Sequence, residues 1–308
     1  MSFCLGFDTS NYTTSVAMFD GSRCYMSGRL LDVPAGALGL RQSEAHFAHT
    51  KRLPGLIDDL FEKSGRVEIS CVAASTRPVE REGSYMPCFL AGESQARVTA
   101  RALGVPFFGY SHQQGHLAAA AWSAGRQDLL KQRFLAWHLS GGTTELLLAE
   151  PDGTCFAAQR IGGTEDLAAG QLIDRTGKLL GTAFPAGPAL DTLAQGADKD
   201  IFFKAKLRGL DFSLSGLENK VNELYQRHER AENIACFAVS SVAHIVLAAT
   251  LEAFRLYGEL PLICSGGVAR NTTVRKLLTA NTPAFFAEPE YSSDNAAGIA
   301  ILGFGGAI

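Results

Sequence analysis

The stretch CLGFDTSNYTTSVAMF, residues 4–19, decides the fold of this chain. It reads as an apolar strand, a tight polar turn that begins Asp8-Thr9-Ser10, and a second apolar strand. Residues 134–150, FLAWHLSGGTTELLLAE, repeat the plan with Ser140-Gly141-Gly142 in the turn. Small hydroxyls and glycines in such a turn let successive backbone N–H groups converge on one anion, usually a phosphate. Two copies predict duplicated halves that close on a nucleotide-like ligand from both sides.

The flanking sequence predicts alternating strands and helices. The first half is expected to hold strands at 3–8, 14–19, 22–30, 70–75 and 105–110 and helices at 44–62 and 93–104. The second half is expected to hold strands at 134–140, 144–150 and 155–161 and helices at 166–180, 215–229, 232–257 and up to 278. Such alternation is typical of an α/β protein with a mixed sheet covered by helices.

Composition places the chain among globular, cytoplasmic proteins. A length of 308 residues is ample for two domains, and a net charge of −3 argues against electrostatic coating of nucleic acid. The seven cysteines show no CxxC spacing, which indicates reduced, buried thiols. No signal peptide is apparent, and the apolar stretch 239–254 contains His244 and Glu252, so we expect no membrane span.

His112 and His116 form the strongest local pattern. Four residues apart on a helix, both imidazoles project from one face and can hold a transition metal with a third ligand from elsewhere. The alternative is two capping or surface histidines beside Gly115. Zinc proteases carry Glu after the first His, whereas this chain has Gln113. Asp294 precedes a run of small residues, where it either caps a helix or completes a His-His-Asp site.

Glycines and hydroxyls at strand-to-helix turns supply candidate nucleotide contacts. Ser265-Gly266-Gly267 presents free N–H groups to a phosphate or ribose, or is a turn that needs glycine for steric reasons. Asp166 is expected to cap the helix 166–180, from which Asp174 reaches a ligand hydroxyl. Ser215 and Glu218 have the spacing of a capping box. A compact basic cluster is either a solvated face or a contact for a polyanion, and it consists of Lys204, Lys206 and Arg208.

These motifs occur in an order that resembles the tRNA threonylcarbamoyladenosine transferases, formerly named O-sialoglycoprotein endopeptidases or glycoproteases. The matching stretches are FDTSNYTTSVAMF, the His112/His116 pair, LSGGTTEL, GTEDLAAGQLIDRTGKLLG, FPAGP, LDFSLSGL, SGGVARN and SDNAAGIA. The resemblance implies the actin/Hsp70/sugar-kinase fold, with two duplicated RNase H-like subdomains around a central cleft. We expect residues 1–118 plus 293–308 to form the first subdomain and residues 119–292 the second.

The resemblance also implies a ligand set. The metal ligands for one iron or zinc ion would be His112, His116 and Asp294. The phosphate of an adenine nucleotide (threonylcarbamoyl-AMP, ATP or AMP) would lie along Leu139, Ser140, Gly141 and Gly142. Its ribose and adenine would meet Asp174, Gly187 and Asn271, with Ser265, Gly266 and Gly267 alongside. The catalytic residues stay open, with Asp8 as a candidate.

The activity implied is transfer of a threonylcarbamoyl group from threonylcarbamoyl-AMP to the exocyclic amine of the tRNA adenosine beside the anticodon. The implied partners are tRNA, bound through a local basic patch or helper subunits, a paralogous subunit and a small P-loop ATPase. Peptidase activity is disfavoured because no general-base Glu accompanies the histidines. Nothing in the sequence marks the pocket of a sugar kinase.

The chain departs from the family pattern at four places, of which the loop at residues 76–88 is expected at the mouth of the cleft. Asp8 replaces the usual Glu and keeps a carboxylate, whereas Thr143 replaces a His and Leu167 an Asp. The expected glycine-rich loop is replaced by TRPVEREGSYMPC, residues 76–88. One alternative is therefore a divergent paralogue with the same metal and nucleotide site but another carbamoyl acceptor. Another is a non-catalytic partner subunit, against which the two histidines count.

Overall fold

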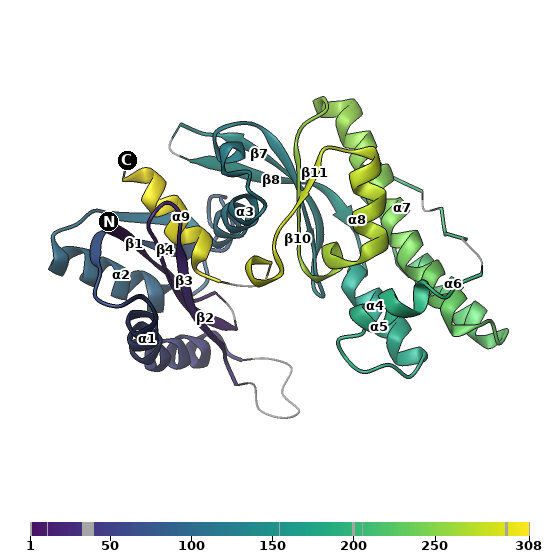
Figure 1. The fold of residues 1–308 in the computed structure, drawn as a ribbon, viewed down its shortest axis with the longest axis horizontal. Helices are drawn as coiled ribbons and strands as arrows, with labels where there is room; N and C mark the ends of the chain where they lie inside the picture. Colours follow the sequence, from purple (N-terminus) through teal and green to yellow (C-terminus); the bar gives the residue numbers. More distant parts are fainter. Residues whose placement is uncertain are drawn as a thin grey trace. The chain divides into compact units, whose positions relative to one another are not determined.

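The computed structural model describes residues 2–10, 12–32, 40–153, 155–198, 201–204, 206–292 and 295–307 (Figure 1). The chain divides into two compact units. The first comprises Met1–Lys131, Glu150–Ala158 and Glu290–Ile308, and the second comprises Gln132–Ala149 and Gln159–Pro289.

The first unit is built on a five-stranded sheet in the order β3-β2-β1-β4-β5. Its strands are β1 (Ser2–Asp8), β2 (Thr13–Phe19), β3 (Cys24–Leu30), β4 (Glu68–Arg77) and β5 (Phe107–Ser111). The β1, β4 and β5 strands run parallel, and β2 is antiparallel to both β1 and β3. This arrangement confirms the strands predicted for the first half.

Alternation along β1 sends side chains to two covered faces of this sheet. Phe3, Leu5 and Phe7 pack in a core with residues of α1 (Gln42–Ser64) and α2 (Phe89–Leu103). On the other face lie α3 (His112–Ser123) and α9 (Ala297–Gly306). A Cβ on Gly6 would lie 2.8 Å from the backbone nitrogen of Ala300, so α9 rests directly on β1.

The second sheet has six strands in the order β11-β10-β6-β7-β8-β9. Its strands are β6 (Phe134–Leu139), β7 (Thr144–Pro151), β8 (Phe156–Thr164), β9 (Asp211–Phe212), β10 (Leu262–Ser265) and β11 (Ala284–Phe286). The helices are α4 (Ala169–Leu179), α5 (Gly187–Ala194), α6 (Ser215–Gln226), α7 (Ala231–Tyr257) and α8 (Thr272–Asn281). Short 3₁₀ turns are η1 (Gln127–Lys131), η2 (Gly267–Arg270) and η3 (Pro289–Tyr291).

Helix α7 is long and apolar enough, by length and composition, to cross a membrane. That differs from the expectation for 239–254, because the helix runs on in both directions. Its most apolar window is 72% buried inside the protein, and Thr250 accepts a hydrogen bond from the indole of Trp137 at 2.8 Å. Packing in the core of the second unit therefore accounts for the apolar composition of α7.

The boundary between the units falls elsewhere than at residues 118 and 293. Residues 119–131 belong to the first unit because α3 continues unbroken to Ser123 and η1 packs against it. Residues 150–158 also belong there, and the side-chain amide of Gln114 donates a 2.6 Å hydrogen bond to the carbonyl of Phe156. The hairpin between β7 and β8 thus contributes to the first unit.

Two predicted helix caps are wrong. Helix α4 begins at Ala169, with Ala168 as its cap residue instead of Asp166. Helix α6 begins at Ser215 with Leu214 in the cap position, so no capping box forms with Glu218. Both errors have one cause, because Asp166 and Ser215 bond to each other.

Candidate functional site

The carboxyl ends of β1 and β5 place Asp8 and His112 at the same edge of the first sheet. Parallel strands end on one side, so the last residue of β1 and the residue after β5 come together. The start of α3 is fixed by a reciprocal cap. The Ser111 hydroxyl accepts a hydrogen bond from the backbone N–H of Gln114 at 3.2 Å, and the side-chain oxygen of Gln114 accepts one from the backbone N–H of Ser111 at 2.8 Å. His112 is therefore the first residue of a firmly held helix.

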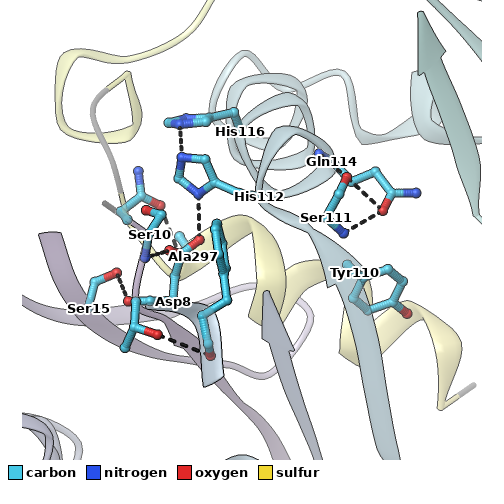
Figure 2. Close-up of polar contacts among 12 residues, drawn as sticks. Asp8, Ser10, Ser15, Tyr110, Ser111, His112, Gln114, His116 and Ala297 are labelled. Carbon is cyan, nitrogen blue, oxygen red and sulfur yellow. Dashed lines mark hydrogen bonds and ion pairs between the residues drawn. The ribbon is translucent and has the colours of Figure 1, made fainter. Parts of the chain in front are cut away.

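A carboxylate and two imidazoles form a hydrogen-bonded chain in the first unit (Figure 2). The Nδ1 atom of His112 lies 2.7 Å from Oδ2 of Asp8, a side chain that is 1% exposed. The Nε2 atoms of His112 and His116 lie 2.8 Å apart. The other oxygen of Asp8 accepts from the backbone N–H of Ser10 at 2.9 Å. Sequence spacing predicted the shared face of the two histidines, and the structure confirms it.

This donor set fits a transition metal. A carboxylate on Nδ1 fixes the ring so that Nε2 carries the lone pair, which is the arrangement found behind metal-binding histidines. Two imidazole nitrogens then face the same point. Asp294, the predicted third ligand, lies outside the described residues, and within the described ranges no group of three His, Cys, Asp or Glu side chains is gathered for a metal.

The replaced loop, residues 76–88, borders this histidine site at both of its ends. The Gln113 amide beside His112 donates to the carbonyl of Pro78 at 3.0 Å. The Thr9 hydroxyl donates to the carbonyl of Cys88 at 3.0 Å, and it accepts from the Gly92 amide at 3.0 Å. The ring of Phe89 meets that of His112 edge-on, with the centroids 6.2 Å apart. The loop therefore forms part of the wall around Asp8 and His112.

In the second unit, the turn between β6 and β7 is held by internal hydrogen bonds, and its two glycines are exposed. The Ser140 amide donates to the Thr143 carbonyl at 2.8 Å, and the Thr143 amide donates to the Ser140 hydroxyl at 3.1 Å. Gly141 and Gly142 are exposed, and a Cβ on either would meet nothing within 4 Å. Their N–H groups are available to an anion. Leu139 is fully buried, so only its backbone is in a position to contact a ligand.

The turn after β10 lies beside this first turn because β10 and β6 are neighbours, with Ser265 paired to His138. Gly266 has φ of +92°, and a Cβ there would lie 2.3 Å from the carbonyl oxygen of Leu139. Only glycine fits such a position. Gly267, by contrast, has open space around it. The structure thus brings the predicted residues 139–142 and 265–267 together.

Asn271 is the cap of α8. Its side-chain oxygen accepts from the amides of Thr273 and Val274 at 3.0 and 3.2 Å. Its amide nitrogen makes no hydrogen bond to the residues that the structure describes. The oxygen of Asn271 is therefore committed to the helix, whereas the nitrogen is left for a ligand.

Asp174 and Gly187 are linked through the backbone. One carboxylate oxygen of Asp174 accepts from the amide of Ala186, the residue before Gly187, at 2.8 Å. Asp191 on α5 in turn accepts from the hydroxyl of Thr272 at the start of α8 at 2.7 Å. These contacts tie α4, α5 and α8 to one another, and with them the three residues predicted for the ribose and adenine side.

Asp166 joins two distant segments of the second unit, a role that was not predicted from the sequence. Its carboxylate accepts from the hydroxyls of Ser213 and Ser215 at 2.5 and 2.6 Å and from the Leu214 amide at 2.9 Å. Burial raises the pKa of this carboxyl, but these hydrogen bonds together outweigh burial and hold the pKa well below its usual range. The carboxylate thus joins the loop before α4 to the start of α6.

The basic cluster predicted at residues 204–208 is exposed on the second unit. Lys204, Lys206 and Arg208 are all exposed, and Arg208 forms an ion pair with Glu165 at 3.3 Å. All seven cysteines are free thiols, as the sequence predicted, but only four are buried, because Cys24, Cys155 and Cys236 are partly exposed.

Comparison with known proteins gives one family and one fold. A family model described as tRNA N6-adenosine threonylcarbamoyltransferase (TsaD) matches residues 36–301. The chain is 32% identical over 319 residues to the protein of that name from Aromatoleum aromaticum, covering 97% of this chain and 90% of that one. It is 30% identical over 315 residues to the one from Thiobacillus denitrificans, covering 97% and 89%.

Solved structures with similar folds share little sequence with the chain. Full-length HypF in its phosphate- and nucleotide-bound form gives a TM-score of 0.62 at 13% identity, covering 99% of this chain but only 55% of HypF. Component A of Acidaminococcus fermentans (R)-2-hydroxyglutaryl-CoA dehydratase gives 0.58 at 14% identity, covering 100% and 99%. The ROK hexokinase of Thermus thermophilus gives 0.52 at 15%, covering 98% of each chain. These likenesses confirm the predicted fold class.

Proposed function

Because the chain belongs to the family of tRNA N6-adenosine threonylcarbamoyltransferases, we propose that it transfers a threonylcarbamoyl group from threonylcarbamoyl-AMP to tRNA with the help of a bound metal. The acceptor is the exocyclic amine of the adenosine beside the anticodon. The observation that carries this proposal is the chain from Asp8 through His112 to His116, with two facing Nε2 atoms. A non-catalytic scaffold subunit would not need a carboxylate and two imidazoles arranged in this way.

The reaction forms one bond and breaks one. The amine nitrogen attacks the carbamoyl carbon, the bond from that carbon to the phosphate oxygen breaks, and AMP leaves with the electron pair, while the amine releases its proton to water. His112, His116 and Asp294 would hold an iron or zinc ion, which supplies positive charge for the oxygens that become more negative. Asp8 holds the ring of His112 in one orientation and one tautomer, so its role is positioning.

The second unit supplies the nucleotide contacts in this proposal. The open N–H groups of Gly141 and Gly142 suit the phosphate of AMP, which leaves as an anion and is stabilised by preorganised donors. The free amide nitrogen of Asn271 suits a ring nitrogen or ribose oxygen. Asp174 keeps one carboxylate oxygen for a ribose hydroxyl, because Ala186 uses the other.

The proposal extends to partners and to the cell compartment. A net charge of −3 is poor for binding tRNA unaided, so we include a paralogous subunit and a small P-loop ATPase as helpers. The exposed Lys204 and Lys206 are the local basic contact on this chain. The free thiols support work in the cytoplasm.

One observation favours a second candidate function, transfer to a different acceptor. The replaced loop 76–88 contacts Thr9 and leads into Phe89, which meets the ring of His112. Tyr85 in the same loop is 61% exposed. Residues 76–88 border the histidine site, so a different loop sequence there is expected to change which acceptor the site recognises.

The experiment supplies the protein and the helper subunits of its host with threonine, bicarbonate, ATP and unmodified tRNA. Digested nucleosides are then read by mass spectrometry. Threonylcarbamoyladenosine that appears with the wild type and is lost with His116→Ala supports transfer to tRNA. No modified nucleoside, while the protein still binds metal and AMP, rejects tRNA as the acceptor and favours the second candidate.

A further inference from the structure

Ser10 has a buried hydroxyl that makes no hydrogen bond to any described residue. The residue is 3% exposed. A buried polar group without a partner is destabilising, so such groups are rare unless something outside the chain forms the missing hydrogen bond. In the described ranges, the hydroxyls of Ser75 and Thr182 share this property. Of these three residues, Ser10 is the one bonded to Asp8.

The surroundings of Ser10 hold it in place beside the histidine site. Its backbone N–H donates to Oδ1 of Asp8 at 2.9 Å, while Oδ2 of the same carboxylate faces His112 at 2.7 Å. The preceding residue, Thr9, is fixed by its bonds to Cys88 and Gly92. Figure 2 shows Ser10 grouped with Asp8 and His112, with His116 beyond. The Ser10 backbone and the side chain of the residue before it are therefore anchored.

The charge next to Ser10 selects the kind of group that its hydroxyl meets. The Asp8 carboxylate is buried and lies two residues before Ser10, and two like charges repel strongly at short range in a protein. A phosphate is therefore disfavoured at Ser10. A neutral carbonyl oxygen, which accepts a hydrogen bond without bringing a full charge, is favoured.

We propose that the Ser10 hydroxyl donates a hydrogen bond to the carbonyl oxygen of the threonylcarbamoyl group in the bound adenylate. This assignment rests on the proposed function and names a residue of the same site. As the amine nitrogen bonds to the carbamoyl carbon, the carbonyl electron pair moves onto that oxygen, and it returns when the bond to AMP breaks. A donor aimed at this oxygen binds more strongly as its charge grows, so it lowers the barrier.

The test compares Ser10→Ala with Thr182→Val. Both variants remove a buried hydroxyl that has no partner among the described residues, and Thr182 lies in the second unit. Ser10→Ala is expected to lower kcat roughly 10- to 100-fold. This loss is equal to or smaller than the loss of kcat caused by removing one hydrogen-bond donor to a developing oxyanion. Its metal content and melting temperature are expected to match the wild type, whereas its KM for the adenylate is expected to rise about tenfold, because the hydroxyl also bonds the carbonyl oxygen before the reaction. Thr182→Val is expected to keep the wild-type kcat.

A binding measurement separates this inference from the proposed function. Metal-loaded protein is titrated calorimetrically with AMP and with a stable analogue of threonylcarbamoyl-AMP in which the anhydride oxygen is replaced. The wild type should bind the analogue more tightly than AMP, and Ser10→Ala should lose about tenfold for the analogue but nothing for AMP.

Each other outcome has a definite meaning. If the wild type discriminates between the two ligands and Ser10→Ala does so equally well, the assignment of Ser10 is overturned and the proposed function stands. If the wild type neither discriminates nor transfers, the proposed function fails and the role of Ser10 fails with it. A lower melting temperature in Ser10→Ala with unchanged binding of both ligands indicates a packing role and also overturns the assignment.

Discussion

The two polar turns at the ends of β1 and β6 share one plan but present opposite surfaces. In the first turn, Asp8 and Ser10 are buried, and the carboxylate is used up by His112 and by the chain itself. In the second turn, Gly141 and Gly142 are exposed, and a Cβ on either would meet nothing within 4 Å. The same local sequence pattern therefore serves to hold side chains in one unit and to leave backbone N–H groups open in the other.

The largest effect that would sharpen this comparison is expected from His116→Ala. Removal of one of two facing imidazole nitrogens should abolish stoichiometric iron or zinc binding and lower transfer by more than about 10³-fold, because a Lewis acid is lost. Affinity for AMP should stay at the wild-type value, since its proposed contacts lie in the second unit. Elemental analysis and calorimetry check both parts, and a variant that keeps one metal per chain would contradict the assignment.

The next largest effect is expected from a pair of glycine variants in the second unit. Gly266→Ala should lower the free energy of unfolding by about 1–3 kcal/mol, because φ is +92° and the new Cβ would press on the Leu139 carbonyl. Gly141→Ala is the matched control, with nothing near its new Cβ, so its stability should stay unchanged. Urea denaturation measures both. Equal losses in the two variants would mean that the turns are not packed as described.

Asn271 separates a structural role from a binding role. Asn271→Ala should cost about 1 kcal/mol of stability because the α8 cap is lost. Asn271→Asp keeps the capping oxygen but replaces the free amide nitrogen, so stability should be retained while AMP affinity falls about tenfold. Thermal melting and calorimetry give the two readouts. Wild-type affinity in Asn271→Asp would remove the residue from the nucleotide site.

Asp166 is expected to show the smallest effect, through the pH dependence of stability. Its folded pKa is depressed, so its contribution is present at neutral pH and is lost as pH falls from about 4 towards the folded pKa. The side chain is exposed, so solvent screening limits the contribution to about 1 kcal/mol. Asp166→Asn should therefore be less stable than the wild type at pH 7, and the difference should shrink below pH 4. A constant difference across that range would exclude the carboxylate charge as its source.

Local patterns in the sequence were enough for the longer strands and for the histidine pair, but not for the short strands β9 and β11. Both apolar strands of residues 4–19 are present, and His112 and His116 share a face of α3 because they are four residues apart on it. Contacts between distant residues could not be predicted in this way. The partners of Asp166 lie 47 and 49 residues away, so its local position before a helix suggested a cap instead.

The same limit applies to the histidine site. Asp8 and His112 are 104 residues apart, and only the register of parallel strands brings them together. A resemblance to a family marked Asp8 as a candidate, but spacing alone did not link it to the imidazoles. The Ser10 hydroxyl, which has no partner among the described residues, was also beyond prediction, because burial of a turn residue depends on contacts with distant parts of the chain.

The most direct test of the central claim is a single-turnover transfer reaction with a synthetic donor. Metal-loaded protein is mixed with threonylcarbamoyl-AMP and an anticodon stem-loop that carries the target adenosine, and the products are read by mass spectrometry. The account predicts equal amounts of threonylcarbamoyladenosine and AMP, with both lost in His116→Ala. An unmodified stem-loop in a mixture where the donor is bound and the metal is present would contradict it.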